Sequence, residues 1–280
     1  MDAVLIDVLG ETLQITLLIT VMMIAVDAVN IWSRGKIALL LRGAHESRQY
    51  VVTSFIGAIP GCFGGFTNVT FYMHGLISFG ALAGSMIASS GDEAFVMLAM
   101  FPKTAIILFI VLFIIGTAGG KLIDYAARKL NMQPCADCHE LVVHDTERNL
   151  KHFFKEHIYK HIIKKHIWKV AIWTFGALLV IQIGFEYLHI EQITSEYKLA
   201  LLFVAALIGL IPESGPNLIF VTLFASGLIP FSILLTNSIV QDGHSMLPLL
   251  SYSVKDSIRI KLFNLVIGII LGLVLFSLGY

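Results

Sequence analysis

Long apolar runs separated by short polar stretches dominate the chain. Ten apolar segments stand out, and a polar stretch near 128–167 divides them into two groups of five. A transmembrane helix needs about 20 apolar residues, and several segments reach that length. The pattern therefore predicts an all-α polytopic membrane protein with about ten transmembrane segments. The segments cover residues 11–31, 50–73, 76–90, 93–101, 104–127, 168–189, 199–223, 227–240, 244–253 and 256–279.

Two of these segments, 93–101 and 244–253, are too short to span a membrane. Nine helical residues rise roughly 14 Å, about half of a hydrocarbon core of roughly 30 Å. Two longer segments contain the shared sequence Ile-Gly-x-Ile-Pro, which ends at Pro60 and at Pro212. Proline interrupts a helix, and lipid tolerates the interruption only where the freed backbone lines a cavity or finds a partner. We expect broken or half-length helices at these places.

The two groups of segments resemble each other. A shift of 152 positions places Ile-Gly-x-Ile-Pro of the first half on the same motif in the second half, and Gly91 on Gly243. Because each half has an odd number of segments, we expect two five-segment inverted repeats, which are typical of secondary transporters with a midplane substrate site. The predicted units are an N-terminal transmembrane repeat (1–127), a central loop (128–167) and a C-terminal transmembrane repeat (168–280).

The composition narrows the class of protein. The chain is 57% hydrophobic and 14% charged, against about 25% charged in soluble domains, which excludes a soluble enzyme. Nineteen basic residues balance nineteen acidic ones, so the net charge indicates no nucleic-acid partner. No phosphate-binding loop is present, so we expect an ion gradient to drive transport. We expect no catalytic activity and no cofactor; the expected partners are a metal ion, protons and the lipid bilayer.

Basic residues predict the orientation in the membrane. They concentrate in loop 32–48, in the central loop and in a cluster of Lys255, Arg259 and Lys261. Threading ten crossings places all three on one face, which the positive-inside rule assigns to the cytoplasm. The acidic loop 189–196 and both termini are then external. The start of the chain lacks the basic region of a cleaved signal peptide, so we expect the first helix to be retained.

Paired polar clusters are the leading candidates for a metal site. Asp92 and Glu93 precede the short segment of the first half, and Asp242 and His244 occupy the corresponding place in the second half. Ionisable groups at membrane depth mark functional sites. Carboxylates suit hard divalent ions, and an imidazole shifts the preference toward manganese or iron. The alternative is a pair of polar turns that cap short helices.

Further candidates lie close to Pro212 and in the first segment. Glu213 and Asn217 follow the proline motif and offer oxygen ligands, although a kink that serves only packing is the alternative. Asp27 lies late in the first segment, where it is either a proton site or an interfacial residue.

The central loop carries a separate set of metal-ligand residues. A cysteine pair with neighbouring histidines binds soft or borderline metals, which favours auxiliary cytoplasmic metal capture or sensing. The alternative is a solvated basic helix attracted to anionic lipid. The residues concerned are Cys135, Cys138, His139, His157 and His161.

Several of these motifs carry a resemblance that covers nearly the whole chain. The sequence resembles the putative ten-helix heavy-metal exporter family, bacterial proteins regarded as manganese transporters and earlier as arsenic efflux proteins. The resemblance implies efflux of a divalent metal, with manganese favoured, across the bacterial inner membrane. Residues 25–30 depart from the family's pattern, which has an acidic residue and aromatics there. The matching stretches are residues 59–62, 78–82, 90–99, 211–216 and 241–250.

Together, these observations predict a secondary active transporter that exports Mn²⁺ or a similar divalent cation by proton antiport. One alternative is an exporter of an arsenical or another anionic or organic substrate. A second is an intramembrane metalloenzyme that activates water with the same side chains. A third is a membrane metal sensor built around the central loop. A homodimer is left open.

Overall fold

The computed structural model describes residues 46–61, 63–91, 93–132 and 197–280, with isolated positions between 6 and 21 and between 168 and 175. These described residues form helices and no strand. The first half contains α3 (Glu46–Gly57), α4 (Phe63–Met73), α5 (Phe79–Ala88), α6 (Glu93–Met100) and α7 (Pro102–Lys129). The second half contains α10 (Lys198–Gly209), α11 (Ser214–Ala225), α12 (Phe231–Val240), the 3₁₀ turn η4 (Gly243–Ser245), α13 (Met246–Tyr252) and α14 (Val254–Ser277).

Two apolar segments are interrupted where the prolines occur. Segment 50–73 corresponds to the two helices α3 and α4, and segment 199–223 corresponds to α10 and α11. Pro60 and Pro212 lie in the gaps, because proline has no N–H to continue a helix. A helix of twelve residues rises about 18 Å, less than the thickness of a bilayer core. The predicted interruptions are therefore confirmed, as are the short helices α6 and α13.

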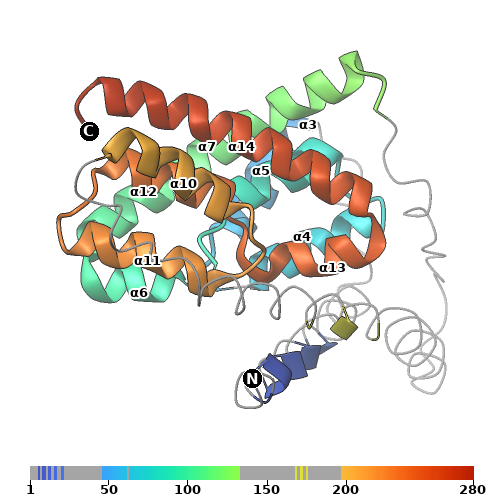
Figure 1. Ribbon diagram of the computed structural model, residues 1–280. Coiled ribbons are helices and arrows are strands. Elements are labelled where there is room, and N and C mark those ends of the chain that lie inside the picture. The colour runs from blue at the N-terminus through green and yellow to red at the C-terminus, as the bar shows by residue number, and fades with distance from the viewer. Residues whose placement is uncertain are drawn as a thin grey trace, which may run out of the picture.

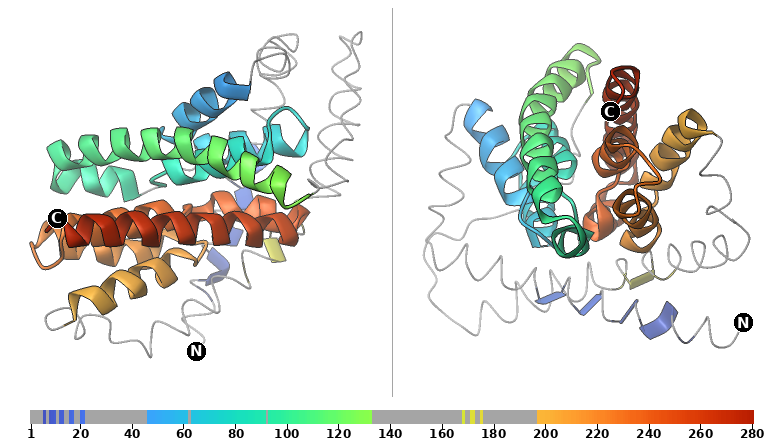
Figure 2. Two further views of the ribbon diagram at one scale, coloured as in Figure 1. Left: turned by 90° about the horizontal axis from the view of Figure 1, so that it is seen from above. Right: turned by 90° about the vertical axis from the view of Figure 1, so that its left-hand side faces the viewer.

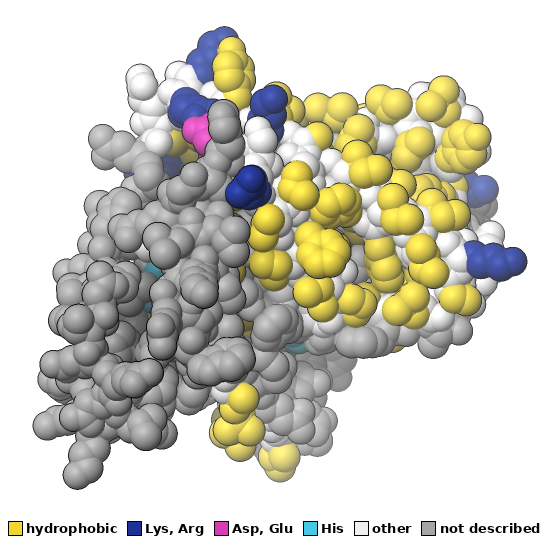
Figure 3. Space-filling view, turned by 180° about the vertical axis from the view of Figure 1, so that it is seen from behind, with side chains coloured by type: hydrophobic (Ala, Val, Ile, Leu, Met, Phe, Trp, Pro, Cys, Tyr) yellow, Lys and Arg dark blue, Asp and Glu magenta, His cyan; other side chains and the backbone are white. Residues whose placement is uncertain are grey.

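Two helices, α7 and α14, are the only ones within the described residues that are long and apolar enough to cross a membrane. They run in opposite directions through the molecule (Figures 1 and 2). Ile258, Leu262, Val266 and Ile270 are exposed along α14. A spacing of four residues places them on one side of the helix. Figure 3 shows such side chains spread over the bundle, with Lys and Arg toward its ends, as expected for a surface that faces lipid.

Helix boundaries recur at an offset of 152. Helices α3 and α10 begin and end 152 positions apart, and so do α5 and α12. The acceptors of two amide contacts recur as well, although the donors lie on different helices. Asn68 Nδ2 of α4 donates to the Thr53 carbonyl oxygen at 2.9 Å, and Asn237 Nδ2 of α12 donates to the Ala205 carbonyl oxygen at 3.0 Å. Positions 53 and 205 also differ by 152. The two halves lie side by side when the bundle is viewed end-on (Figure 2).

Each long helix packs closely against a shorter one at a glycine. In the first half, Gly116 of α7 faces the Gly84 carbonyl of α5; in the second, Gly268 of α14 faces the Thr236 carbonyl of α12. A Cβ at Gly116 would lie 2.4 Å from the Gly84 carbonyl oxygen, whereas a Cβ at Gly268 would lie 2.6 Å from Val240 Cγ2 and 3.3 Å from the Thr236 carbonyl oxygen. Small residues allow such close approach between membrane helices, so the backbones of α5 and α7 are nearly in contact and α12 packs tightly on α14.

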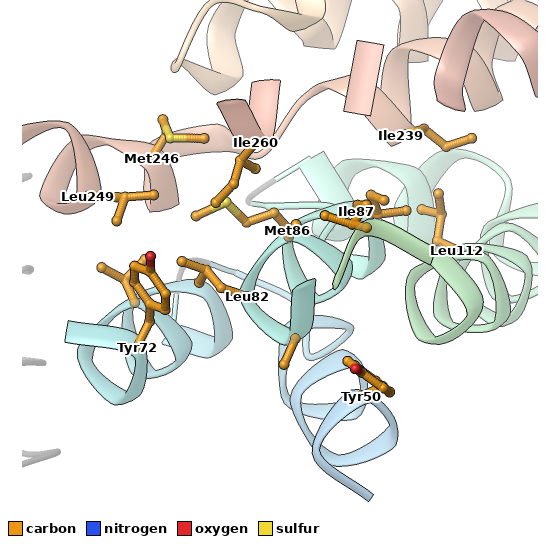
Figure 4. Packing of buried hydrophobic residues seen from close by; sticks show 14 of the residues in the cluster. Tyr50, Tyr72, Leu82, Met86, Ile87, Leu112, Ile239, Met246, Leu249 and Ile260 are labelled. Carbon is orange, nitrogen blue, oxygen red and sulfur yellow. The ribbon is translucent and has the colours of Figure 1, made fainter. Parts of the chain in front are cut away.

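One hydrophobic core joins the halves. Leu82 and Met86 of α5 lie opposite Met246, Leu249 and Ile260 of the second half (Figure 4). The short helices also cross between halves, since α6 packs against α11 and α13 packs against α4. This exchange of helices places the starts of α6 and η4 at the centre of the molecule.

Candidate functional site

Two glycine turns from opposite halves meet at the centre of the structure. Gly91 has φ +53° and lies before α6, whereas Gly243 has φ +50° and opens η4. This left-handed conformation costs about 1–2 kcal/mol for a residue with a Cβ. A Cβ added to Gly91 would lie 3.8 Å from the Cα of Gly243, so the turns abut. Gln241 Nε2 donates to the Ser89 carbonyl oxygen at 3.3 Å and links the two halves beside them.

The interrupted helices end against the same turns. Gly61, in the gap between α3 and α4, donates its N–H to the Gly91 carbonyl oxygen at 2.9 Å. In the second half, Ser214 follows the gap between α10 and α11. Its Oγ would lie 3.2 Å from a Cβ added to Gly243. The structure therefore brings both proline breaks and both glycine turns together.

His244 and Glu213 form a close pair at this junction. His244 Nε2 lies 2.9 Å from Glu213 Oε1, and the two side chains are 11% and 13% exposed. Asn217 Nδ2 donates to the Glu213 carbonyl oxygen at 2.7 Å. Asn237 Nδ2 donates in turn to Asn217 Oδ1 at 2.8 Å. These amide contacts hold the backbone of Glu213 in place, so its carboxylate is presented to the imidazole by a supported loop.

Asp242 forms a buried ion pair with a residue that was not a predicted site residue. Asp242 is fully buried, and its Oδ1 lies 2.7 Å from the Lys261 ammonium. Lys261 Nζ also donates to the carbonyl oxygens of Gly209 at 2.9 Å and Val240 at 3.2 Å. The sequence counted Lys261 with Lys255 and Arg259 in the basic cluster that orients the chain, but the structure places Lys261 in the interior. Lys255 is exposed, whereas Lys261 is 9% exposed and lies among helix ends.

Glu93 completes the acidic side of this polar core. It is 1% exposed, begins α6 and lies within electrostatic range of the Lys261 ammonium. Within the described ranges, no three His, Cys, Asp or Glu side chains lie close enough to hold a metal by themselves. Oxygen ligands of other kinds are abundant, however. The buried side-chain oxygens that lack a hydrogen-bond partner in the described structure include Asp242 Oδ2, Glu213 Oε2, Gln241 Oε1, Ser90 Oγ, Ser214 Oγ and Ser245 Oγ.

A helical pattern reveals why Lys261 is buried. Ser257, Lys261, Asn264 and Gly268 recur at intervals of four, three and four residues and are all buried. Such a spacing defines one side of a helix. The polar and small residues of this side oppose the exposed apolar stripe of α14. That pattern could have assigned Lys261 to the interior from the sequence.

Other predicted residues lie outside the described part of the chain. They are Asp27, Asp92, Cys135, Cys138, His139, His157 and His161.

Comparison with protein families identifies the family to which the chain belongs. The sequence model of the family described as putative 10TM heavy-metal exporter matches residues 2–187 and 153–279. The chain belongs to this family. The resemblance carried by the sequence motifs is thereby confirmed. Membership indicates a multi-pass membrane protein of a transporter family with heavy-metal substrates. Comparisons with curated proteins and with solved structures gave no match.

Proposed function

We propose that the protein is a secondary active transporter that exports a divalent metal cation, with Mn²⁺ as the favoured substrate and protons as the counter-ion. The observation that carries this proposal is the buried polar core at the two glycine turns. It combines three carboxylates, one imidazole and several hydroxyl and amide oxygens at the junction of both halves. Carboxylate and neutral oxygens with one imidazole form a ligand set suited to manganese or iron.

The formal charge of the core favours a cation. Glu93, Asp242 and Glu213 supply three negative charges, whereas Lys261 supplies one positive charge. With a neutral His244, two negative charges are left over among these described side chains. Since a buried charge without compensation is costly, a bound divalent cation would balance the core. An anionic substrate such as an arsenical would increase the imbalance.

We assign the ligands as follows. Glu213 and His244 contact each other already and would share the ion, and Asp242 would join when it is released from Lys261. Glu93 approaches from the first half. Asn217 Oδ1 accepts one hydrogen bond and has a second lone pair for the ion.

Residues outside the described structure enter on sequence grounds alone. Asp92 aligns with His244 in the repeat and is a proposed ligand, and Asp27 is a proposed proton site. The central-loop cysteines and histidines are proposed to capture metal on the cytoplasmic side. Because metal ligands must lose their protons to bind, loading and unloading of the ion would exchange metal for protons.

The halves are proposed to be inverted repeats that alternate the access of the site. The opposite directions of α7 and α14 and the recurrent helix boundaries support this proposal. The Arg128–Glu46 ion pair of 2.7 Å joins the end of α7 to the start of α3. Lys129 and Arg48 lie nearby in the chain, and we assign this basic end to the cytoplasm of a bacterial inner membrane.

Transport by purified protein in proteoliposomes tests the proposal. Vesicles loaded with Mn²⁺, Fe²⁺, Zn²⁺, Ca²⁺ or arsenite are compared at controlled internal and external pH. We expect Mn²⁺ flux that increases with an opposing proton gradient. A Glu46→Gln variant is a suitable control, because Glu46 is exposed at the end of the bundle. Arsenite flux without divalent-metal flux would overturn the proposed substrate. Flux that does not respond to the proton gradient would overturn antiport.

A further inference from the structure

The buried ammonium of Lys261 occupies a complete cation site. An ammonium group has three donors and no acceptor. Here all three have an oxygen partner: Asp242 Oδ1 at 2.7 Å, the Gly209 carbonyl at 2.9 Å and the Val240 carbonyl at 3.2 Å. Gly209 ends α10 and Val240 ends α12. Both carbonyls therefore carry the negative end of a helix dipole. One carboxylate and two such carbonyls are oxygen ligands of the kind that hard metal ions use.

The fold does not require this charge pair. In the first half, the positions 152 residues before Asp242 and Lys261 are Ser90 and Phe109. The equivalent helices α5 and α7 nevertheless pack with the same close glycine contact as α12 and α14. Buried ion pairs also contribute little net stability compared with apolar residues of similar size. A role in packing therefore does not explain why the second half carries a lysine there.

The location of the pair connects it to the substrate. Asp242 is the residue before the Gly243 turn, and His244, which contacts Glu213, follows that turn. Glu93 of the other half lies within electrostatic range of the same ammonium. A metal ion at Asp242 would lie beside this ammonium, and one that binds the carboxylate through Oδ1 takes an oxygen away from Lys261.

We propose that Lys261 is a tethered competitor of the transported metal: its ammonium occupies the oxygen site formed by Asp242, Gly209 and Val240 until a divalent cation displaces it. This inference rests on the proposed function and identifies what limits the affinity of the site for the metal. A competitor attached to the protein has a constant, high local concentration, as linked binding groups generally do. It weakens metal binding and hastens release of the metal, as an exporter requires.

Mn²⁺ binding to purified Lys261 variants tests this competition. Calorimetry of Lys261→Met should show Mn²⁺ bound at least about tenfold more tightly than by wild type, equivalent to about 1.4 kcal/mol. Lys261→Arg retains the charge and should bind no more tightly than wild type. Lys255→Met is the matched control, because Lys255 lies on the same helix but is exposed; it should leave the affinity unchanged.

A second measurement covers the case in which Lys261→Met folds poorly because Asp242 is left without a counter-charge. Mn²⁺ should then raise the melting temperature of Lys261→Met by more than it raises that of wild type. The double variant Asp242→Asn/Lys261→Met removes both charges and should fold without metal, but it should lose the tight binding.

The outcomes separate the inference from the proposed function. If wild type binds Mn²⁺ and Lys261→Met binds it equally or more weakly, with no larger thermal shift, Lys261 is not a competitor and this inference fails. If wild type neither binds nor transports any divalent metal, the proposed function itself fails.

Discussion

The His244–Glu213 pair allows a sharp test of whether the junction is a metal site or a structural contact. The changes are His244→Ala in one variant and Glu213→Gln in a second. His244 Nε2 lies 2.9 Å from Glu213 Oε1, and both side chains are nearly buried. Loss of one partner from a buried charged group costs about 3–5 kcal/mol. Applied to a ligand of a bound ion, this corresponds to a loss of affinity of more than about a hundredfold.

A structural contact alone predicts a different result. Loss of one hydrogen bond costs about 1 kcal/mol of stability, with unchanged metal affinity. Calorimetric Mn²⁺ binding and thermal unfolding of the same purified samples distinguish the two. His74→Ala is the matched control, because His74 directly follows α4 and its Nδ1 lies 2.6 Å from the Thr70 carbonyl oxygen, and this variant should bind Mn²⁺ normally. The metal site is refuted if His244→Ala and Glu213→Gln both bind Mn²⁺ with wild-type affinity.

Three further expectations follow from the fold and the sequence. Gly243→Ala should destabilise the protein by about 1–2 kcal/mol in thermal unfolding, because the φ of Gly243 is +50°. Gly215→Ala should not, because a Cβ added there would meet open space, and equal effects would contradict the role of the turn. A membrane-impermeant maleimide on intact cells should label Ser277→Cys but not Arg48→Cys; the reverse pattern would overturn the proposed orientation. Replacement of both central-loop cysteines and His139 should alter apparent metal affinity in transport assays but preserve flux, and complete loss of flux in a folded variant would place the essential site in that loop.

Local sequence signals predicted the interruptions of the helices correctly. Proline acts on its own helix, so Pro60 and Pro212 alone were sufficient to predict where α3 and α10 end. Segment length was likewise sufficient for α6 and α13. The repeat offset, seen first as matching residues, reappears in the boundaries of α5 and α12.

Contacts between distant segments were harder to predict. Glu213 and His244 were each candidates, but their pairing depends on how the second break folds against η4, which residue types do not specify. Lys261 was counted only as one of three basic residues that orient the chain, and its position on the helix was not considered. Its neighbours on the same side of α14, Ser257 and Asn264, show that the phase places it inside. The roles of Asp92 and Asp27 stay predictions.

The glycine contacts between helices have a mechanical consequence. Because Gly116 brings the backbones of α5 and α7 nearly into contact, and Gly268 packs against Val240 and Thr236 of α12, neither helix of a pair can slide past the other without a collision. Each pair must therefore move as one rigid body. Any change of shape that opens the centre first to one side and then to the other must therefore occur at hinges between these pairs. The gaps around Pro60 and Pro212 suit this role, because the helical hydrogen bonds are already missing there.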